Sequence, residues 1–204
     1  MTVDQTGAIS RRAMVGGLFS GTIALSGLAS PAFALSKDGA KALIDQLVGE
    51  INKVIASGKS EGAMIRDFER IFGRYADVNI IARSALGADS RRASAGQLRS
   101  FTTAFRSYIA RKYGKRFREF VGGRLEVNGT KTVRNAFQVS TTAYLRGEAP
   151  FEVTFHVGQK SGKFFNMFIE GVNMLLTERT EIGSMLDKRR GDIDAMISDL
   201  KKAG

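Results

Sequence analysis

The sequence contains no cysteine and no tryptophan, and it has only two prolines and one histidine. Without cysteine the chain forms no disulfide and has no thiol nucleophile or thiolate metal ligand. His156 falls in the polar set of an alternating strand pattern, where a surface role is far more common than a catalytic one. The acidic residues lack the spacing of a metal site, and no serine has a partnered base. The sequence therefore predicts no enzyme, no metal and no cofactor.

The first 34 residues have the pattern of an export signal. Ser10-Arg11-Arg12 precedes an uncharged apolar stretch, and Pro31-Ala32-Phe33-Ala34 ends it with an A-x-A cleavage pattern. The stretch is shorter than a bilayer requires, and paired arginines after a serine are typical of twin-arginine export. We therefore expect residues 1–34 to be a twin-arginine signal peptide and residues 35–204 to form one domain in the periplasm. An uncleaved anchor helix is the alternative.

Basic residues outnumber acidic ones, and the chain has a net charge of +11. Residues 1–34 contain two arginines and one aspartate, so residues 35–204 keep a net charge of +10. Such a charge favours an anionic partner, either nucleic acid or a membrane surface. Because an exported protein seldom meets nucleic acid, we expect transient contact with a membrane surface and no nucleic acid. A nucleic-acid binder remains an alternative if the protein stays in the cytoplasm.

The spacing of apolar residues changes once along the chain. Steps of three and four predict helices over 37–57, around 64–72, over 78–86 with Asp77 as its cap, and over 94–121. A period of two then predicts strands over 124–128, 133–145, 151–157 and 163–169, with a turn at Asn128-Gly129. A helical region follows Gly171. This order predicts an α+β fold, in which N-terminal helices pack on one face of a four-stranded or slightly larger antiparallel sheet and a C-terminal helix closes the structure.

The predicted helix over 94–121 is aromatic on one side and basic on the other. An ordinary core stripe with a solvated opposite face explains this pattern, and the wall of an apolar cavity is the alternative. The aromatic residues are Phe101, Phe105, Tyr108, Tyr113, Phe117 and Phe120.

Two segments carry a family resemblance. In the first, Ala82-Arg83-Ser84-Ala85-Leu86-Gly87 has the form A-R-x-x-L-G and is followed by Q-x-x-x-F-x-x-A-F from Gln97 to Phe105. In the second, Glu170-Gly171-Val172-Asn173 continues into Thr177-Glu178-Arg179. In the order and spacing of these segments the chain resembles the MlaC family of toluene-tolerance or ABC-transporter auxiliary proteins. It departs from the family's E-G-V-S hallmark at Asn173, and it lacks the tryptophan usual in the preceding strand.

The resemblance implies an NTF2-like cone of antiparallel sheet and helices that encloses an apolar cavity. It also implies a periplasmic phospholipid carrier that shuttles lipid between the outer membrane and an inner-membrane ABC transporter complex and so maintains outer-membrane asymmetry. The implied partners are that transporter and an outer-membrane lipoprotein/porin complex. Burial of an acyl chain is worth about 0.8 kcal/mol per methylene, so a deep apolar cavity can extract a lipid from a bilayer.

The expected cavity residues follow from the same resemblance together with the apolar faces of the predicted elements. The head group is expected at the mouth, near arginine or lysine. The sheet wall is expected to comprise Phe137, Val139, Val153, Phe155, Met167 and Ile169, and the helical wall Phe101, Phe105, Tyr108 and Tyr113, with Val172 from the hallmark segment. Two alternatives remain open: a carrier of another apolar lipid such as a hopanoid, and a transporter adaptor with a filled core and no lipid.

Overall fold

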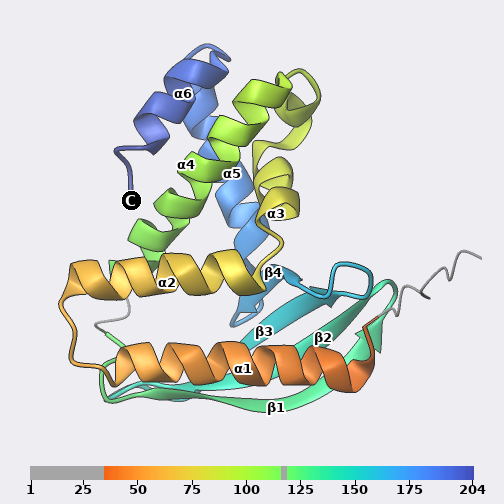
Figure 1. Cartoon of the computed structure of the whole chain (residues 1–204), viewed down its shortest axis with the longest axis vertical. Coiled ribbons are helices and arrows are strands. Elements are labelled where there is room, and N and C mark those ends of the chain that lie inside the picture. The colour runs from red at the N-terminus through yellow and green to blue at the C-terminus, as the bar shows by residue number, and fades with distance from the viewer. Residues whose placement is uncertain (1–34, 116–118) are drawn as a thin grey trace, which may run out of the picture. The chain divides into compact units, whose positions relative to one another are not determined.

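The computed structural model describes residues 35–115 and 119–204, so the expected signal peptide lies outside the described residues. The helices are α1 (Lys37–Ile55), α2 (Glu61–Tyr75), α3 (Val78–Leu86), the 3-10 turn η1 (Gly87–Arg91), α4 (Ala95–Gly114), α5 (Met174–Lys188) and α6 (Ile193–Leu200) (Figure 1). The strands are β1 (Arg124–Val133), β2 (Ala136–Tyr144), β3 (Phe151–Gly158), β4 (Phe164–Ile169) and β5 (Val172–Asn173). The expected α+β fold is confirmed.

Side-chain caps set the starts of most helices. The Ser36 hydroxyl accepts from the Gly39 amide at 3.0 Å, and the Asp77 carboxylate accepts from the Ile80 amide at 3.2 Å. Ser94 and Gln97 form a capping box at the start of α4. Each cap satisfies backbone amides that the first turn of a helix leaves without a partner. Residues adjacent in sequence therefore define these helix starts.

The five strands pair antiparallel in the order β1-β2-β3-β4-β5. Helix α1 lies along β1 and β2 (Figure 1). The Asn52 amide on α1 donates to the Leu125 carbonyl and accepts from the Leu125 amide, both at 3.0 Å. The Asp77 amide donates to the Phe164 carbonyl at 2.8 Å, which joins the α2–α3 junction to β4. Beyond this layer, α3 packs against α4 and α5, and α6 packs against α4 and α5.

The expected turn at Asn128-Gly129 is wrong. Strand β1 continues through these residues with a register shift between Val127 and Gly129, and the chain turns at Arg134 and Asn135 instead. A bulge absorbs the extra residue while the ladder continues, and the Asn128 amide donates to the Thr142 hydroxyl at 2.8 Å. The ladder continues from Gly129 to Val133 opposite Ala136 to Ser140 of β2, and this pairing outweighs the local turn preference.

Two helix ends also differ from expectation. Helix α4 ends at Gly114 instead of Val121, and Phe120 begins a turn closed by the Gly123 amide; Phe117 lies outside the described residues. The expected closing helix is divided into α5 and α6. Arg190 has a positive φ of 54° at the break, and the Arg189 guanidinium donates to both carboxylate oxygens of Asp199 at 2.5 and 2.7 Å. None of the helices in the described parts of the chain is long and apolar enough to cross a membrane.

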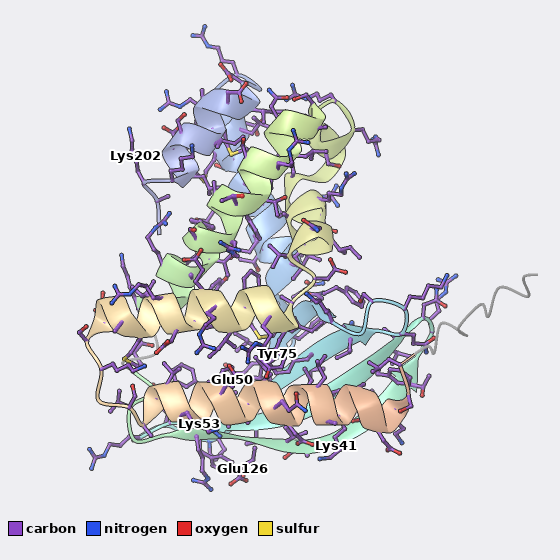
Figure 2. All side chains as sticks on the ribbon, in the orientation of Figure 1. Lys41, Glu50, Lys53, Tyr75, Glu126 and Lys202 are labelled. Atoms are coloured by element: carbon purple, nitrogen blue, oxygen red, sulfur yellow. The ribbon has the colours of Figure 1, made fainter. Side chains whose placement is uncertain are left out.

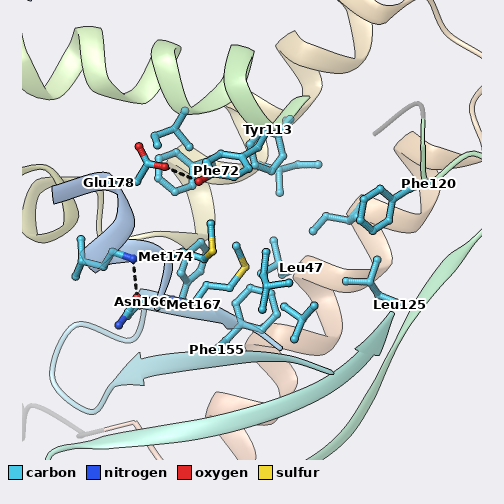
Figure 3. Close-up of a pocket in the computed structure, with 18 of the residues that line it drawn as sticks. Leu47, Phe72, Tyr113, Phe120, Leu125, Phe155, Asn166, Met167, Met174 and Glu178 are labelled. Carbon is cyan, nitrogen blue, oxygen red and sulfur yellow. Dashed lines mark hydrogen bonds between the residues drawn. The ribbon is translucent and has the colours of Figure 1, made fainter. Parts of the chain in front are cut away.

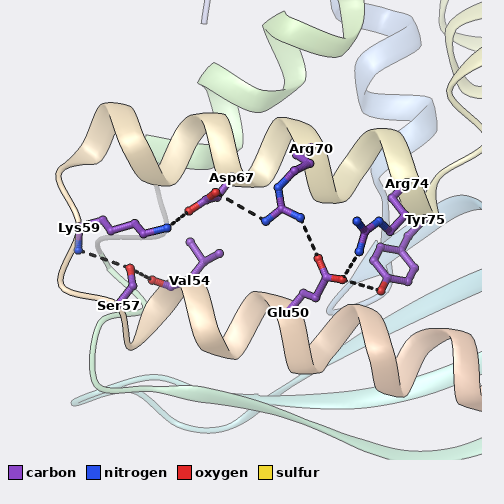
Figure 4. A network of polar contacts seen from close by, with 8 residues as sticks. All are labelled: Glu50, Val54, Ser57, Lys59, Asp67, Arg70, Arg74 and Tyr75. Carbon is purple, nitrogen blue, oxygen red and sulfur yellow. Dashed lines mark hydrogen bonds and ion pairs between the residues drawn. The ribbon is translucent and has the colours of Figure 1, made fainter.

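A polar network joins α1 to α2. The Glu50 carboxylate accepts from Arg74 Nη1 at 2.6 Å, from the Tyr75 hydroxyl at 2.9 Å and from Arg70 Nη1 at 3.4 Å (Figure 4). Figure 2 shows Glu50 and Tyr75 in the space between the two helices, whereas Lys53 lies on the other side of α1. Partial burial alone would raise the pKa of Glu50, but the Tyr75 hydroxyl and the two arginines outweigh it and lower the pKa.

The Glu50→Gln variant is expected to lose about 1 kcal/mol of unfolding free energy at neutral pH, because the arginines are largely exposed and the hydrogen bond to Tyr75 is only partly buried. A carboxylate with a lowered folded pKa stabilises above its unfolded value and loses that contribution as pH falls through the folded pKa. The difference in unfolding free energy between wild type and Glu50→Gln should therefore be constant near neutrality, and it should begin to decrease at about pH 4 and vanish below the folded pKa of Glu50. Urea denaturation of both proteins across pH measures it; an advantage that persists at pH 2.5 would contradict the assignment.

Candidate functional site

A cavity of about 540 Å³ lies between the sheet and the helices. Leu47 on α1, Phe72 on α2 and Tyr113 on α4 converge on it from the helical side, and Phe155 and Met167 face it from the sheet (Figure 3). Its lining is mostly aliphatic and aromatic, and the volume lies in the range typical of small-molecule sites. Such a cavity suits a flexible apolar ligand.

The register of β3 and β4 builds the sheet wall. Val153 pairs with Ile169 and Phe155 with Met167, so the four side chains lie on one face of two adjacent strands. The same alternation places Phe168 on the opposite face, where its ring lies 4.8 Å from the His156 ring. His156 is half-buried there, and desolvation, with a smaller contribution from Lys131, lowers its pKa. His156 therefore lies outside the cavity.

The structure separates the expected cavity residues into three groups. Six of them line the cavity: Phe105, Tyr113, Val153, Phe155, Met167 and Ile169. Four are buried in the adjacent core without lining it: Phe101, Tyr108, Phe137 and Val139. Val172 is 56% exposed and does not line the cavity.

Several lining residues lay outside the expectation. Leu47 and Ile51 of α1 and Phe68 and Phe72 of α2 line the cavity. Their helical spacing predicts only that they are buried. Periodicity shows that one face of a helix is buried, but not whether that face packs against side chains or borders a cavity. Phe120, in the turn after α4, also lines the cavity.

A polar cluster joins α4 to α5 at the cavity wall. Glu178 is only 3% exposed and lines the cavity; its Oε1 accepts from Lys112 Nζ at 2.8 Å and from the Tyr113 hydroxyl. Glu178 Oε2 is buried and has no hydrogen-bond partner among the described residues. Lys112 also donates to Glu181, which accepts from the Tyr108 hydroxyl at 2.6 Å. One ammonium thus serves two carboxylates.

The pKa shifts in this cluster follow from burial and hydrogen bonding. Desolvation, and then the hydrogen bond to Glu181, raise the pKa of Tyr108. Burial opposes the charged forms of Lys112 and Glu181, but their mutual hydrogen bond and charge outweigh it, so the pKa of Lys112 is raised and that of Glu181 is lowered. These two groups are therefore both charged at neutral pH.

The hallmark segment forms the turn from β4 into α5. Glu170 and Gly171 have positive φ angles of 50° and 80°, and Asn173 caps α5. Asn173 Oδ1 accepts from the Leu176 amide at 3.1 Å and from Asn166 Nδ2 at 3.0 Å. A serine, as in the family pattern, also caps a helix. The departure at Asn173 thus retains the cap.

We expect Asn173→Ala to lower the unfolding free energy by about 1 kcal/mol, because the α5 cap is lost and Asn166 loses its partner. Asn173→Ser should lose clearly less, since its hydroxyl can accept from the helix amides. Urea denaturation of the three proteins tests this expectation. Equal losses in the two variants would show that the cap contributes nothing measurable.

The two family segments meet in space. Helix α3 packs on α5, and Gly87 ends α3 with a φ of 65°. A Cβ at Gly87 would lie 3.0 Å from Nε of Arg179, so a larger residue would crowd this side chain as well as strain the backbone. The glycine of A-R-x-x-L-G and the arginine of Thr177-Glu178-Arg179 are therefore neighbours in the fold.

The cavity opens where its exposed lining residues gather. Four lining residues are exposed: Glu119, Glu148, Ala149 and Glu170. They belong to the segments at one end of the sheet, before β1, between β2 and β3, and after β4. No arginine or lysine of residues 35–115 and 119–204 lines the cavity, and the expectation of a basic residue near the head group stays a prediction.

Comparison with known proteins agrees with this geometry. The family model described as MlaC protein matches residues 41–202. A solved structure of a phospholipid-binding protein from Ralstonia solanacearum, in complex with a phospholipid, is similar with a TM-score of 0.69 and 17% sequence identity; the match covers 80% of this chain and 95% of that chain. This likeness shows the fold. No curated protein sequence matches the chain. Because the family model spans most of the sequence, with both characteristic segments inside it, the chain belongs to the MlaC family.

Proposed function

We propose that this protein is a phospholipid carrier and has no catalytic role. The observation that carries the proposal is the apolar cavity of about 540 Å³, open at one end of the sheet. At about 0.8 kcal/mol per methylene, a lining of this kind offsets the cost of removing an acyl chain from a bilayer. The similar protein from Ralstonia solanacearum, solved with a phospholipid, supports the same ligand class.

The proposed setting is the periplasm. In this proposal residues 1–34 direct export and are removed, and residues 35–204 form the carrier domain. The carrier takes lipid from or delivers it to an outer-membrane lipoprotein/porin complex and an inner-membrane ABC transporter complex, which maintains outer-membrane asymmetry. Membership of the MlaC family supports this setting. The net charge of +10 on residues 35–204 supports transient contact with anionic membrane surfaces.

The proposal is tested by native mass spectrometry of the protein purified from a bacterial periplasm, followed by solvent extraction and lipid identification. A stoichiometric mass shift that extracts as phospholipid is the expected result. A ring lipid such as a hopanoid would keep the carrier role but change the cargo. A protein that is empty, and that also takes up no lipid from vesicles, would overturn the proposal in favour of an adaptor. The open cavity already weighs against the filled core that an adaptor would have.

A further inference from the structure

Within the described part of the chain, the charged residues that line the cavity are all of one sign. Among the described residues they are Glu119, Glu148, Glu170 and Glu178, and none is basic. The chain as a whole has 31 lysines and arginines and 20 aspartates and glutamates, so the charge of these lining residues is opposite in sign to the net charge of the chain. A carrier that binds the phosphate of its lipid with cationic side chains would instead have lysine or arginine in this lining. In the part of the lining that the structure describes, Glu148 and Glu170 therefore place negative charge at the mouth.

The register of the sheet brings the mouth carboxylates together. Ala143 pairs with Phe151, so the loop that holds Glu148 leaves the sheet at this end. Val153 pairs with Ile169, and the Glu170 amide donates to the Glu152 carbonyl at 2.9 Å, which places Glu170 at the same end. Neighbouring Arg124 is held by Glu126 at 2.6 Å and lies over the Tyr144 ring, and exposed Arg146 does not line the cavity.

Glu178 is a second and independent indication. Its side chain is 4% exposed and lines the same cavity, and its Oε2 has no donor among the described residues. The ammonium of Lys112 is shared with Glu181, so it does not pair with Glu178 alone. A buried acceptor without a donor is costly, and a cationic or hydrogen-bonding group of a ligand would reduce that cost.

We propose that the cavity selects lipids whose head group carries an ammonium, such as zwitterionic aminophospholipids, over lipids with a net-anionic head group. This inference rests on the proposed phospholipid-carrier function. With the acyl chains in the apolar interior, the head group lies at the mouth between Glu148 and Glu170. The carboxylates attract the ammonium and repel a head group that has only phosphate charge.

The test is competitive loading from vesicles that contain equal amounts of phosphatidylethanolamine and phosphatidylglycerol with the same acyl chains. Both lipids then share one surface, so the attraction of the basic protein to that surface does not bias the result. The bound lipids are extracted and quantified. We expect about five- to tenfold enrichment of phosphatidylethanolamine, decreasing as ionic strength rises.

The matched variants separate local from overall charge. The double variant Glu148→Gln, Glu170→Gln should bring the enrichment of phosphatidylethanolamine close to one. The control is the double variant Asp38→Asn, Asp45→Asn, which removes the same charge from exposed positions of α1 and should leave the enrichment unchanged. Wild-type loading without preference, or with preference for phosphatidylglycerol, would overturn the inference, as would equal effects of the two double variants. Absence of any loading would instead overturn the carrier function itself.

Discussion

The Ile169→Trp variant is expected to lose about nine-tenths of its bound lipid. Ile169 lines the cavity from β4 and pairs with Val153 on β3, so the larger indole fills space that the acyl chains need. Ile169 is only half-buried, so the indole can enter the cavity without displacing the fully buried core. Lipid content is measured by extraction from protein loaded on vesicles.

The adjacent residue is the matched control for this experiment. Phe168 lies on the opposite face of β4, against His156, and does not line the cavity. Phe168→Trp should therefore keep near-normal lipid content while making a similar change in the same strand. Both variants should retain the circular dichroism spectrum of the wild type. If Ile169→Trp binds as much lipid as Phe168→Trp, the cavity is not where the acyl chains bind.

The Phe101→Ala variant is expected to have the largest effect on stability, a loss of about 3–5 kcal/mol of unfolding free energy. Phe101 is fully buried on α4, its ring centroid lies 5.6 Å from that of Phe105, and it does not border the cavity. Removal of the ring leaves a closed void whose neighbours relax only partly. The loss is a large share of the 5–15 kcal/mol that stabilises a typical domain.

Phe151→Ala provides the comparison for this variant. Phe151 is half-buried and lines the cavity, so its ring already contacts open space on one side. We expect it to lose about 1–2 kcal/mol, because fewer packing contacts disappear. Urea denaturation of lipid-free protein measures both values. A loss at Phe101 no greater than that at Phe151 would show that the core around α4 is not packed as the structure has it.

Most of the fold could be predicted because its signals are local. Asp77 and Ser94 cap their helices with their own side chains, so α3 begins as expected and α4 begins within one residue. The alternation of Phe151, Val153, Phe155 and Val157 likewise marked β3. Asn128-Gly129 failed for the opposite reason. Its turn preference is local, but the pairing of β1 with β2 adds many more contacts and continues past it.

The sequence by itself determined the element types, the buried faces and, through its two characteristic segments, the family. Only the tertiary structure decided which buried residues border empty space. Phe101 and Phe105 stand one turn apart on α4 and are both fully buried, yet Phe105 alone lines the cavity. Likewise Glu148 and Glu170 come to the same end of the sheet only through the register of β2, β3 and β4. The periodicity of a sequence indicates whether a residue is buried. A cavity and its charge depend instead on the space that remains between residues distant in sequence once they have packed.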